Sequence, residues 1–246
     1  MKNILKVITA VVVLFMVYSC EPEDETMPLV QDESITESEL LDLVDQSYFS
    51  NLNERNQRPG ISFESVLDMV SGNFDEVGKS LLLRKPGKGL AMVLKAKGEP
   101  LTANTAWWII FNNPENCTDG ICGDDPDFAD LINGEETGLA MLYASGSVSK
   151  KNGESVFVAY LKEGQLTEGV NGKLLGQPER VLAEGNAGHA QVNLVVRSHG
   201  PAIPGQIMEQ IGSHGGGCVT DFPPFSQIPV NEGECADIQA SVHIAG

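Results

Sequence analysis

Basic residues are scarce in this chain. Only 16 of its 246 residues are Lys or Arg, against 34 Asp or Glu, which gives a formal net charge of −18 at pH 7. A protein that binds nucleic acid needs a basic surface to meet the phosphates, and so does one that docks on anionic lipid. The composition therefore excludes a general nucleic-acid binder and argues against electrostatic attachment to a membrane.

Long hydrophobic runs are lacking as well. The apolar run near the start covers residues 7–17 and follows Lys2 and Lys6. A membrane-spanning helix needs about 20 apolar residues, so this run is too short to be one. A short basic region before a short apolar run is typical of a signal peptide, which we predict over residues 1–19.

The predicted signal peptide ends in Val17-Tyr-Ser-Cys20. This segment resembles the lipobox of bacterial lipoproteins, in which an aliphatic, a variable and a small residue precede a cysteine. The resemblance implies cleavage before Cys20, a diacylglyceryl group on its thiol and a further acyl chain, such as palmitate, on the new amino terminus. Several buried acyl chains, at ~0.8 kcal/mol per methylene, make a stable anchor. The alternative is an ordinary secreted protein that is cleaved nearby, with Cys20 incidental.

The segment after Cys20 is strongly acidic. Ten acidic residues and no basic one lie between Glu21 and Asp45. Like charges keep a chain extended and solvated, so residues 20–33 are predicted to be a tether. The acidic cluster also resembles the signal that sends some Gram-negative lipoproteins to the cell surface, and no Asp follows Cys20 directly. We expect an outer-membrane location, with the protein facing either the periplasm or the outside.

The cysteine count agrees with an oxidising compartment. If Cys20 carries lipid, four cysteines remain: Cys117, Cys122, Cys218 and Cys235. An even set in an exported protein indicates two disulfides. Sequence order favours Cys117–Cys122 and Cys218–Cys235, although three pairings exist.

Residues 34–77 are predicted to be helical. Thr36 and Glu39 have capping-box spacing, and apolar residues recur with helical spacing in two places. The first predicted helix has Leu40, Leu43, Val44 and Tyr48 on one face. The second runs from Phe63 to Asp75 and has Phe63, Val66, Leu67 and Val70 on one face.

Residues 78–246 are predicted to be mainly β. Strands are expected at residues 81–84, 90–96, 105–111, 141–149, 155–161, 190–197 and 238–244, with a short helix at 207–211. The strand at 105–111 should be buried on both faces, because it is apolar throughout. Asn152-Gly153 predicts a tight hairpin with positive φ at both central residues. In the last strand Ile238, Ala240, Val242 and Ile244 are expected to point inward. Short strands at this spacing favour a β-sandwich, immunoglobulin-like in general form.

Two segments carry further resemblances. Residues 107–117 and 195–205 look like parts of a family of uncharacterised secreted bacterial proteins, a likeness that spans about residues 81–218. His199-Gly-Pro-Ala-Ile-Pro-Gly205 is similar to the His-Gly-Pro-Ala-x-x-Gly stretch of the CHRD domain, an extracellular β-sandwich module. CHRD proteins usually carry a second histidine two residues earlier, where this chain has Arg197. The resemblance implies a CHRD-like sandwich rather than a function.

An aspartate-rich loop is one candidate ligand site. Five aspartates lie between Asp119 and Asp130, among them Asp124, Asp125 and Asp127. Closely spaced carboxylates on a loop suit Ca²⁺, although the pattern is not that of an EF-hand. The alternative is a solvated acidic loop.

Three other residues are candidates for binding. Trp107 and Trp108 should point to opposite faces of a strand, so that Trp108 either lines a groove and stacks on a sugar or fills the core. Arg197 is expected to clamp a carboxylate or to form a simple ion pair. His199 is expected to bind a transition metal or to serve as a structural residue. The candidate binding residues are therefore Trp108, Asp124, Asp125, Asp127, Arg197 and His199.

No catalytic motif is present in the sequence. Neither a Gly-x-Ser-x-Gly elbow nor a phosphate-binding loop occurs, and the histidine spacing is not that of a zinc site. The sequence favours a non-enzymatic lipoprotein that binds a polysaccharide, an envelope protein or a cation through loops at one end of the sandwich. The alternatives are a Ca-, Zn- or Cu-dependent extracytoplasmic binding protein or enzyme that uses His189, His199 or His214, and a structural subunit of an envelope complex.

Overall fold

The computed structural model describes residues 60–118, 120–123, 129–166, 180–212, 216 and 235–244. All of them belong to one compact unit of the chain. The predicted signal peptide, Cys20, the acidic tether and the helix at 36–48 lie outside the described residues. Among the described residues, no helix has the length and apolarity needed to cross a membrane.

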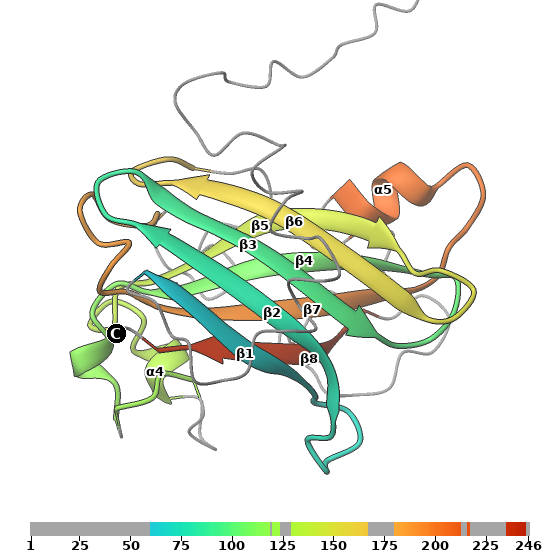
Figure 1. Ribbon diagram of the computed structural model, residues 1–246, viewed down its shortest axis with the longest axis horizontal. Helices are drawn as coiled ribbons and strands as arrows, with labels where there is room; N and C mark the ends of the chain where they lie inside the picture. Colours follow the sequence, from blue (N-terminus) through green and yellow to red (C-terminus); the bar gives the residue numbers. More distant parts are fainter. Residues whose placement is uncertain are drawn as a thin grey trace, which may run out of the picture. The chain divides into compact units, whose positions relative to one another are not determined.

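Eight strands and three short helices make up the described residues (Figure 1). The strands are β1 (Ile61–Asp68), β2 (Glu76–Lys85), β3 (Gly89–Lys97), β4 (Thr102–Phe111), β5 (Leu139–Val148), β6 (Glu154–Lys162), β7 (Gln191–Pro201) and β8 (Ala236–His243). The helices are η1 (Pro114–Asn116), α4 (Ala129–Ile132) and α5 (Ile207–Gly212). The prediction of a mainly β protein is therefore confirmed.

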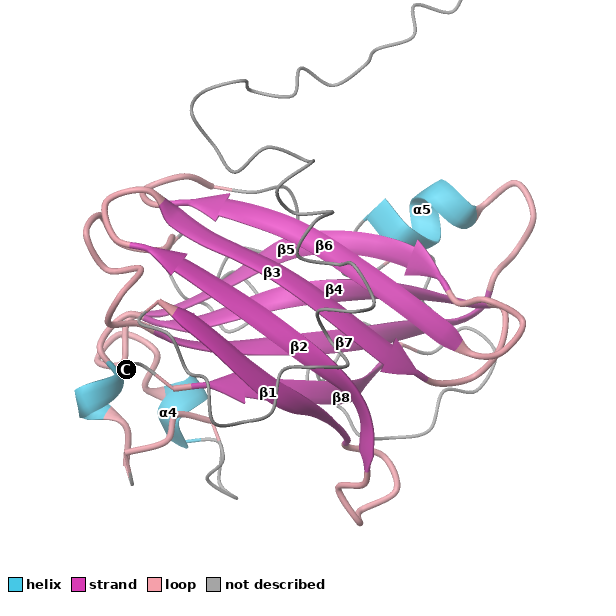
Figure 2. Cartoon of the chain, viewed as in Figure 1, coloured by secondary structure: helices cyan, strands magenta, loops and turns pink. Residues whose placement is uncertain are grey.

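The strands form one antiparallel sheet in the order β5-β4-β7-β8-β1-β2-β3-β6. Strands β5 and β6, which stand at the two edges of this order, lie against each other, so the sheet is nearly closed (Figure 2). Its two ends carry different loops. We call them the Thr102 end, where β4 begins, and the Phe111 end, where β4 finishes.

Side chains alternate between the inside and the outside of this sheet. The main core lies inside and includes Trp108, Ile110 and Leu194. A second cluster lies outside, around Trp107 and the disulfide loop. A third cluster, which we call the outer apolar face, lies on β1, β2, β3 and β6 and consists of Ile61, Phe63, Leu81, Leu83, Ala91, Val93, Val158 and Tyr160. Strand β4 is buried on both faces, as predicted.

The predicted helix from Phe63 to Asp75 is wrong. Residues 61–68 form β1, and a turn joins them to β2. Phe63 belongs to the outer apolar face and Val66 to the inner core, with a register irregularity between Val66 and Leu67. Because β1 carries apolar residues on both faces, their spacing in the sequence resembles the spacing on one face of a helix. The sheet begins at residue 61 rather than at 78.

The predicted orientation of the last strand is confirmed for Ile238, which packs against the inner core, but is wrong for the rest of the strand. In β8 the polar residues Asp237, Gln239, Ser241 and His243 are buried, whereas Ala240 and Val242 are only partly buried and Ile244 is exposed. Leu194 of the inner core lies opposite Ser241 in the β7–β8 register. The buried polar groups are stable there because other side chains satisfy them.

A turn is present at Asn152-Gly153, but the predicted tight hairpin is wrong, because β5 and β6 do not pair with each other. Gly153 has a φ of +82°, whereas Asn152 does not have a positive φ. The turn connects β5 to β6, and these are the first and last strands of the hydrogen-bonded order. The turn therefore joins the two edges of the nearly closed sheet. The other predicted strands and the short helix at 207–211 are confirmed.

Candidate functional site

The aspartate-rich loop has a rigid base at the Phe111 end. Cys117 and Cys122 form a disulfide, as predicted. Gln191 of β7 donates to the Cys122 carbonyl oxygen at 2.7 Å and accepts from the Cys122 amide at 2.9 Å. Asn193 donates to the same carbonyl at 3.0 Å. These bonds attach the loop to the outside of the sheet.

Asp130 organises this loop from within. Its carboxylate accepts hydrogen bonds from the amide and hydroxyl of Thr118, both at 2.9 Å, and from the Gly123 amide at 3.2 Å. Asp124, Asp125 and Asp127 lie outside the described residues, so calcium binding stays a prediction. Within the part of the chain that the structure describes, no group of three or more His, Cys, Asp or Glu side chains is placed to hold a metal ion.

Arg197 binds a carboxylate of its own chain. The side chain is fully buried, and its guanidinium lies 3.1 Å from the Asp237 carboxylate. Burial raises the pKa of Asp237 to about 7, against the attraction of Arg197, which lowers it. Arg197 is therefore part of the interior of the molecule and is not presented to a ligand.

His199 belongs to a buried chain of polar contacts on the outer side of β4 and β7. The Trp107 indole N–H donates to Thr105 Oγ1 at 2.8 Å, and this oxygen lies 2.8 Å from His199 Nε2. Thr105 Oγ1 accepts the indole proton and also shares a hydrogen bond with Nε2, whose direction depends on which ring nitrogen of His199 carries the proton. Burial and the nearby charge of Arg197 lower the pKa of His199 to about 4.

The Nδ1 atom of His199 faces the residues that border the segment 217–234. It lies 3.1 Å from the Cys235 sulfur, and the backbone of Gly216 makes a hydrogen bond with the ring. Both ring nitrogens are thus engaged within the protein, which makes a structural role, and not metal binding, the role of His199 in this structure. His189 is exposed, and His214 lies outside the described residues.

Cys235 is disulfide-bonded. Cys117 and Cys122 are paired with each other, so the partner of Cys235 lies outside the described residues. The pairing with Cys218 stays a prediction.

Trp108 fills the inner core. It is 0% exposed, whereas its neighbour Trp107 packs outside the sheet against Tyr143, with ring centroids 5.6 Å apart. The two tryptophans point to opposite faces, as predicted, but neither lines a groove. The hypothesis that Trp108 stacks on a sugar is therefore wrong.

The inside of the sheet holds a second buried histidine. His243 lies 2.7 Å from the Ser62 hydroxyl and 2.9 Å from the Ser80 hydroxyl. Burial and the charge of Arg84 lower its pKa to about 3. Arg84 closes this region at the Phe111 end by donating to the carbonyl oxygens of Ala187, Ala190 and His243.

A pocket of about 560 Å³ opens at the Thr102 end. Six strands contribute to it, because the ends of β1, β3 and β7 and the starts of β2, β4 and β8 meet there. Its polar lining includes Asp68, Lys97, Glu99, Ser198 and Gln239. Val70, Val77 and Ile238 supply apolar surface. A mixed lining of this size is typical of a site for a small molecule or a short chain segment.

Four large apolar side chains of the turns and of the segment after β7 are exposed. Phe74 is 56% exposed, Leu101 53%, Ile203 46% and Met208 76%. Phe74, Leu101 and Ile203 come from the β1–β2 turn, the β3–β4 turn and the segment after β7, all at the Thr102 end. Met208 lies in α5, which packs on β4 and β5. Phe74 and Leu101 also have positive φ, at 54° and 56°. A bulky side chain seldom adopts this conformation, which marks both turns as unusual.

The structure does not unite the sequence-predicted candidates in one site. It brings Arg197 and His199 together with Thr105, Trp107 and Asp237, but in a buried structural cluster. Sequence reasoning missed the pocket, since its residues come from separate turns and no spacing links them. The one local signal was Leu101, an apolar residue in a turn directly after Pro100.

No protein-family model matches this chain, and no curated protein matches it.

Proposed function

We propose that this chain is a non-enzymatic lipoprotein of the outer membrane that binds another envelope protein at the Thr102 end of its sheet. Cys20 supplies the lipid anchor in this proposal, and residues 20–33 the tether. The observation that carries it is the exposure of Phe74, Leu101 and Ile203 on three separate segments at the end of the sheet where the pocket opens. Exposed apolar side chains that cluster in one region mark an interaction surface, whereas scattered ones need no explanation.

The character of the pocket favours a peptide segment over a polysaccharide. The lining residues that the structure describes include no aromatic ring, which a sugar ring would stack on. They do include both signs of charge, in Lys97 and Glu99, together with the amide of Gln239. Apolar, amide and charged groups in one pocket suit the mixed chemistry of a peptide.

We further propose that the sheet is a flattened β-sandwich with a CHRD-like end. Its halves β5-β4-β7-β8 and β1-β2-β3-β6 share the inner core, as the two layers of a sandwich do. His199-Gly-Pro201 closes β7 at the Thr102 end, next to the pocket.

The experiment is capture of envelope proteins by the purified mature protein and by two variants. Phe74→Asn/Leu101→Asn removes two apolar side chains at the Thr102 end, and Asn tolerates positive φ. Leu166→Asn is the matched control, because Leu166 is 47% exposed and follows β6 at the Phe111 end. We expect a partner protein that the wild type and Leu166→Asn retain and that Phe74→Asn/Leu101→Asn loses. Equal capture by all three proteins would contradict the proposal, and so would glycan binding that survives in the double variant.

A further inference from the structure

The outer apolar face has an apolar centre, and basic residues lie along its borders. In Figure 1 its strands β1, β2, β3 and β6 lie in front of the rest of the sheet. Lys79 and Lys95 lie opposite each other in the β2–β3 register, two residues from the apolar pair Leu81 and Val93. Because side chains alternate along a strand, these lysines and Lys97 share the outer side with the apolar residues. They line a groove of about 430 Å³ over β2 and β3.

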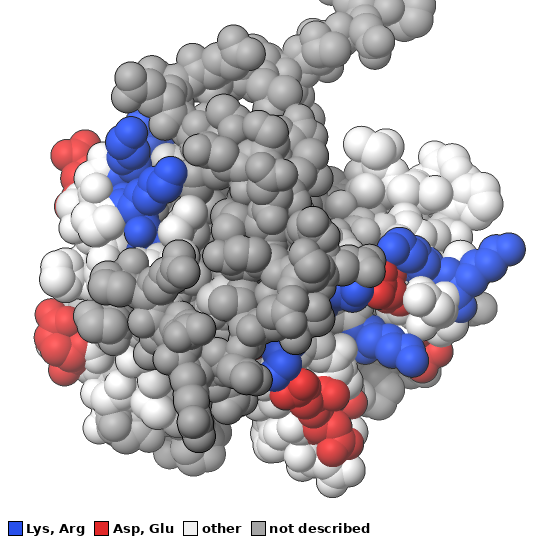
Figure 3. All heavy atoms as spheres, viewed as in Figure 1, with Lys and Arg blue, Asp and Glu red and all other residues white. Residues whose placement is uncertain are grey.

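Basic side chains border the opposite side of the face too. Lys85 follows Leu83 on β2, and Lys162 follows Tyr160 on β6, each at a spacing of two. Figure 3 shows Lys and Arg side chains toward the left and the right of this view, with Asp or Glu side chains beside them. In a chain with a net charge of −18, basic residues at both borders of one apolar face are a notable concentration.

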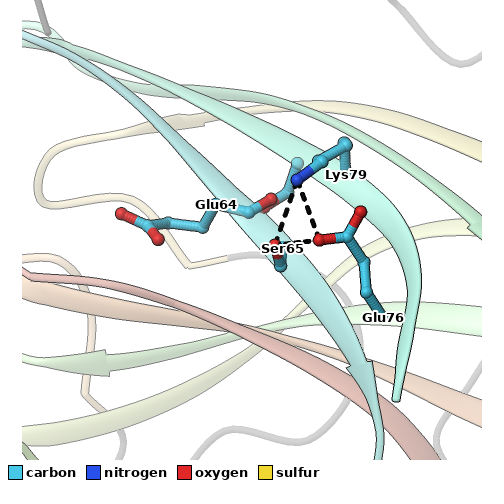
Figure 4. A network of polar contacts seen from close by, with 5 residues as sticks. Glu64, Ser65, Glu76 and Lys79 are labelled. Carbon is cyan, nitrogen blue, oxygen red and sulfur yellow. Dashed lines mark hydrogen bonds and ion pairs between the residues drawn. The ribbon is translucent and has the colours of Figure 1, made fainter. Parts of the chain in front are cut away.

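Glutamates neutralise only part of this charge. Glu76 pairs with Lys79 at 2.9 Å, and Ser65 donates to the same carboxylate (Figure 4). Glu154 pairs with both Lys95 and Lys150, at 2.9 and 2.7 Å. These hydrogen bonds lower the pKa of Glu154 to about 2. At the Thr102 side three lysines thus pair with two glutamates, and Lys97 lines the pocket together with Asp68 and Glu99.

The centre of the face is buried although the described helices lie elsewhere. Leu81, Ala91 and Val93 are each 1% exposed. Helix α5 packs on β4 and β5, and α4 belongs to the segment after the disulfide loop, so neither covers this face. An uncovered apolar sheet face would leave these side chains in contact with water, which is unfavourable, so the face calls for a cover.

We propose that residues 36–48 of this chain dock on the outer apolar face. Their pattern predicts a helix with Leu40, Leu43, Val44 and Tyr48 on one side and carboxylates on the others. A helix of 13 residues is about 20 Å long, and the seven residues from Lys79 to Lys85 span about 20 Å of strand. The acidic flanks of the helix then meet the lysines at both borders while its apolar side meets the centre.

Residues 36–48 are close in the sequence to the strand that begins the outer apolar face. The first described strand, β1, begins at Ile61, which belongs to the outer apolar face. The twelve residues between Tyr48 and Ile61 can span up to about 40 Å when extended, so the segment reaches any part of the face. Docking would hold the start of the sheet next to the tether and fix the direction in which the Thr102 end points.

Zero-length carbodiimide crosslinking of the mature protein, followed by peptide mass spectrometry, tests the proposal. We expect crosslinks within one molecule from Glu37, Glu39, Asp42 or Asp45 to the lysines that border the face: Lys79, Lys85, Lys95, Lys97 and Lys162. The ion pairs Lys79–Glu76 and Lys95–Glu154 are internal controls, because they should crosslink whatever covers the face. A mixture of unlabelled and ¹⁵N-labelled protein separates links within a molecule from links between two copies.

A matched pair of variants sharpens the test. Leu40→Ser/Leu43→Ser should lower the yield of these crosslinks by about tenfold or more, because each removes a buried leucine. Ser38→Ala, on the opposite side of the predicted helix, should leave the yield unchanged. The proposal is overturned if the control pairs crosslink but residues 37–45 do not. Links only between copies, or links from residues 167–179 to these lysines in place of 37–45, would overturn it as well.

Discussion

Arg197 and Asp237 form the most buried ion pair among the described residues, with side chains 0% and 4% exposed. A charge in such a place needs its partner, because neither group can regain water. Arg197→Met should therefore lower the free energy of unfolding by about 3–5 kcal/mol. The loss should be visible as a lower midpoint in urea unfolding.

The double variant Arg197→Met/Asp237→Leu is the control for this prediction. It replaces the pair by apolar side chains and should recover most of the lost stability. If Arg197→Met alone is as stable as the wild type, the pair does not hold β7 and β8 together as described.

The two buried histidines make the fold sensitive to acid. Their pKa values lie at about 4 for His199 and about 3 for His243, below the ordinary 6.5, so the native state binds their protons more weakly than the unfolded state does. Their contribution to stability is complete above pH 6.5 and is lost as the pH falls toward 4 and 3. The pKa of Asp237, raised from 3.8 to about 7, acts with the opposite sign and gains stability as the pH falls from 7 to 4.

Between pH 6.5 and 4, unfolding adds one proton to each of the two histidines and releases one proton from Asp237. The net result is the uptake of one proton on unfolding. The free energy of unfolding should therefore fall by roughly 1.4 kcal/mol per pH unit in this range. His243→Asn removes one histidine and should make the slope nearly flat, whatever its effect on stability at pH 7. Urea unfolding at a series of pH values measures both slopes, and equal slopes would contradict the account.

At the scale of the elements, the turn between β5 and β6 joins the two edges of the sheet. Gly153 is needed there for two reasons: its φ is +82°, and a Cβ atom would lie 2.1 Å from the Gly98 carbonyl oxygen. Gly87 has a similar φ of +76° with open space around it. Gly153→Ala should thus cost more stability than the roughly 1 kcal/mol expected for Gly87→Ala. Thermal unfolding of both variants compares them directly, and equal losses would show that the close approach to Gly98 is unimportant.

The sequence predicted most strands but not the faces of all of them. Strand β4 was recognisable because it is apolar throughout, and in β7 the inward residues Val192, Leu194 and Val196 alternate clearly. Strand β8 misled the prediction, since its polar residues are buried beside Ser80 and Arg197, which are remote in sequence. The alternation of apolar and polar residues along a strand shows that its two faces differ. Which face lies inside depends on the residues that pack against it in the fold.

The candidate site was less predictable than the fold. Arg197 and His199 were correctly singled out as unusual, but their partners, Asp237 and Thr105, carry no signal in the sequence. Phe74 fell within the wrongly predicted helix and Leu101 between two predicted strands, and only the sheet shows that both lie in turns at the same end. A binding surface assembled from separate turns depends on topology, which local spacing does not reveal.

At the scale of the whole molecule, the two ends of the sheet carry different features. The Phe111 end carries the disulfide and the aspartate-rich loop, which is fastened to β7 through Cys122. The Thr102 end carries the pocket and the exposed apolar side chains. The predicted tether, together with the docking proposed for residues 36–48, would direct one of these ends toward a partner in the envelope.

The measurement that tests the central claim most directly is the stability and partner capture of one variant, Leu101→Asn. Because Leu101 is held at a φ of 56° and is largely exposed, Asn should relieve strain and raise the free energy of unfolding by about 1 kcal/mol. If the Thr102 end is the binding surface, the same variant should capture less of its envelope partner while Leu166→Asn captures as much as the wild type. A variant that gains stability and still binds fully would contradict the claim that this end of the sheet serves recognition.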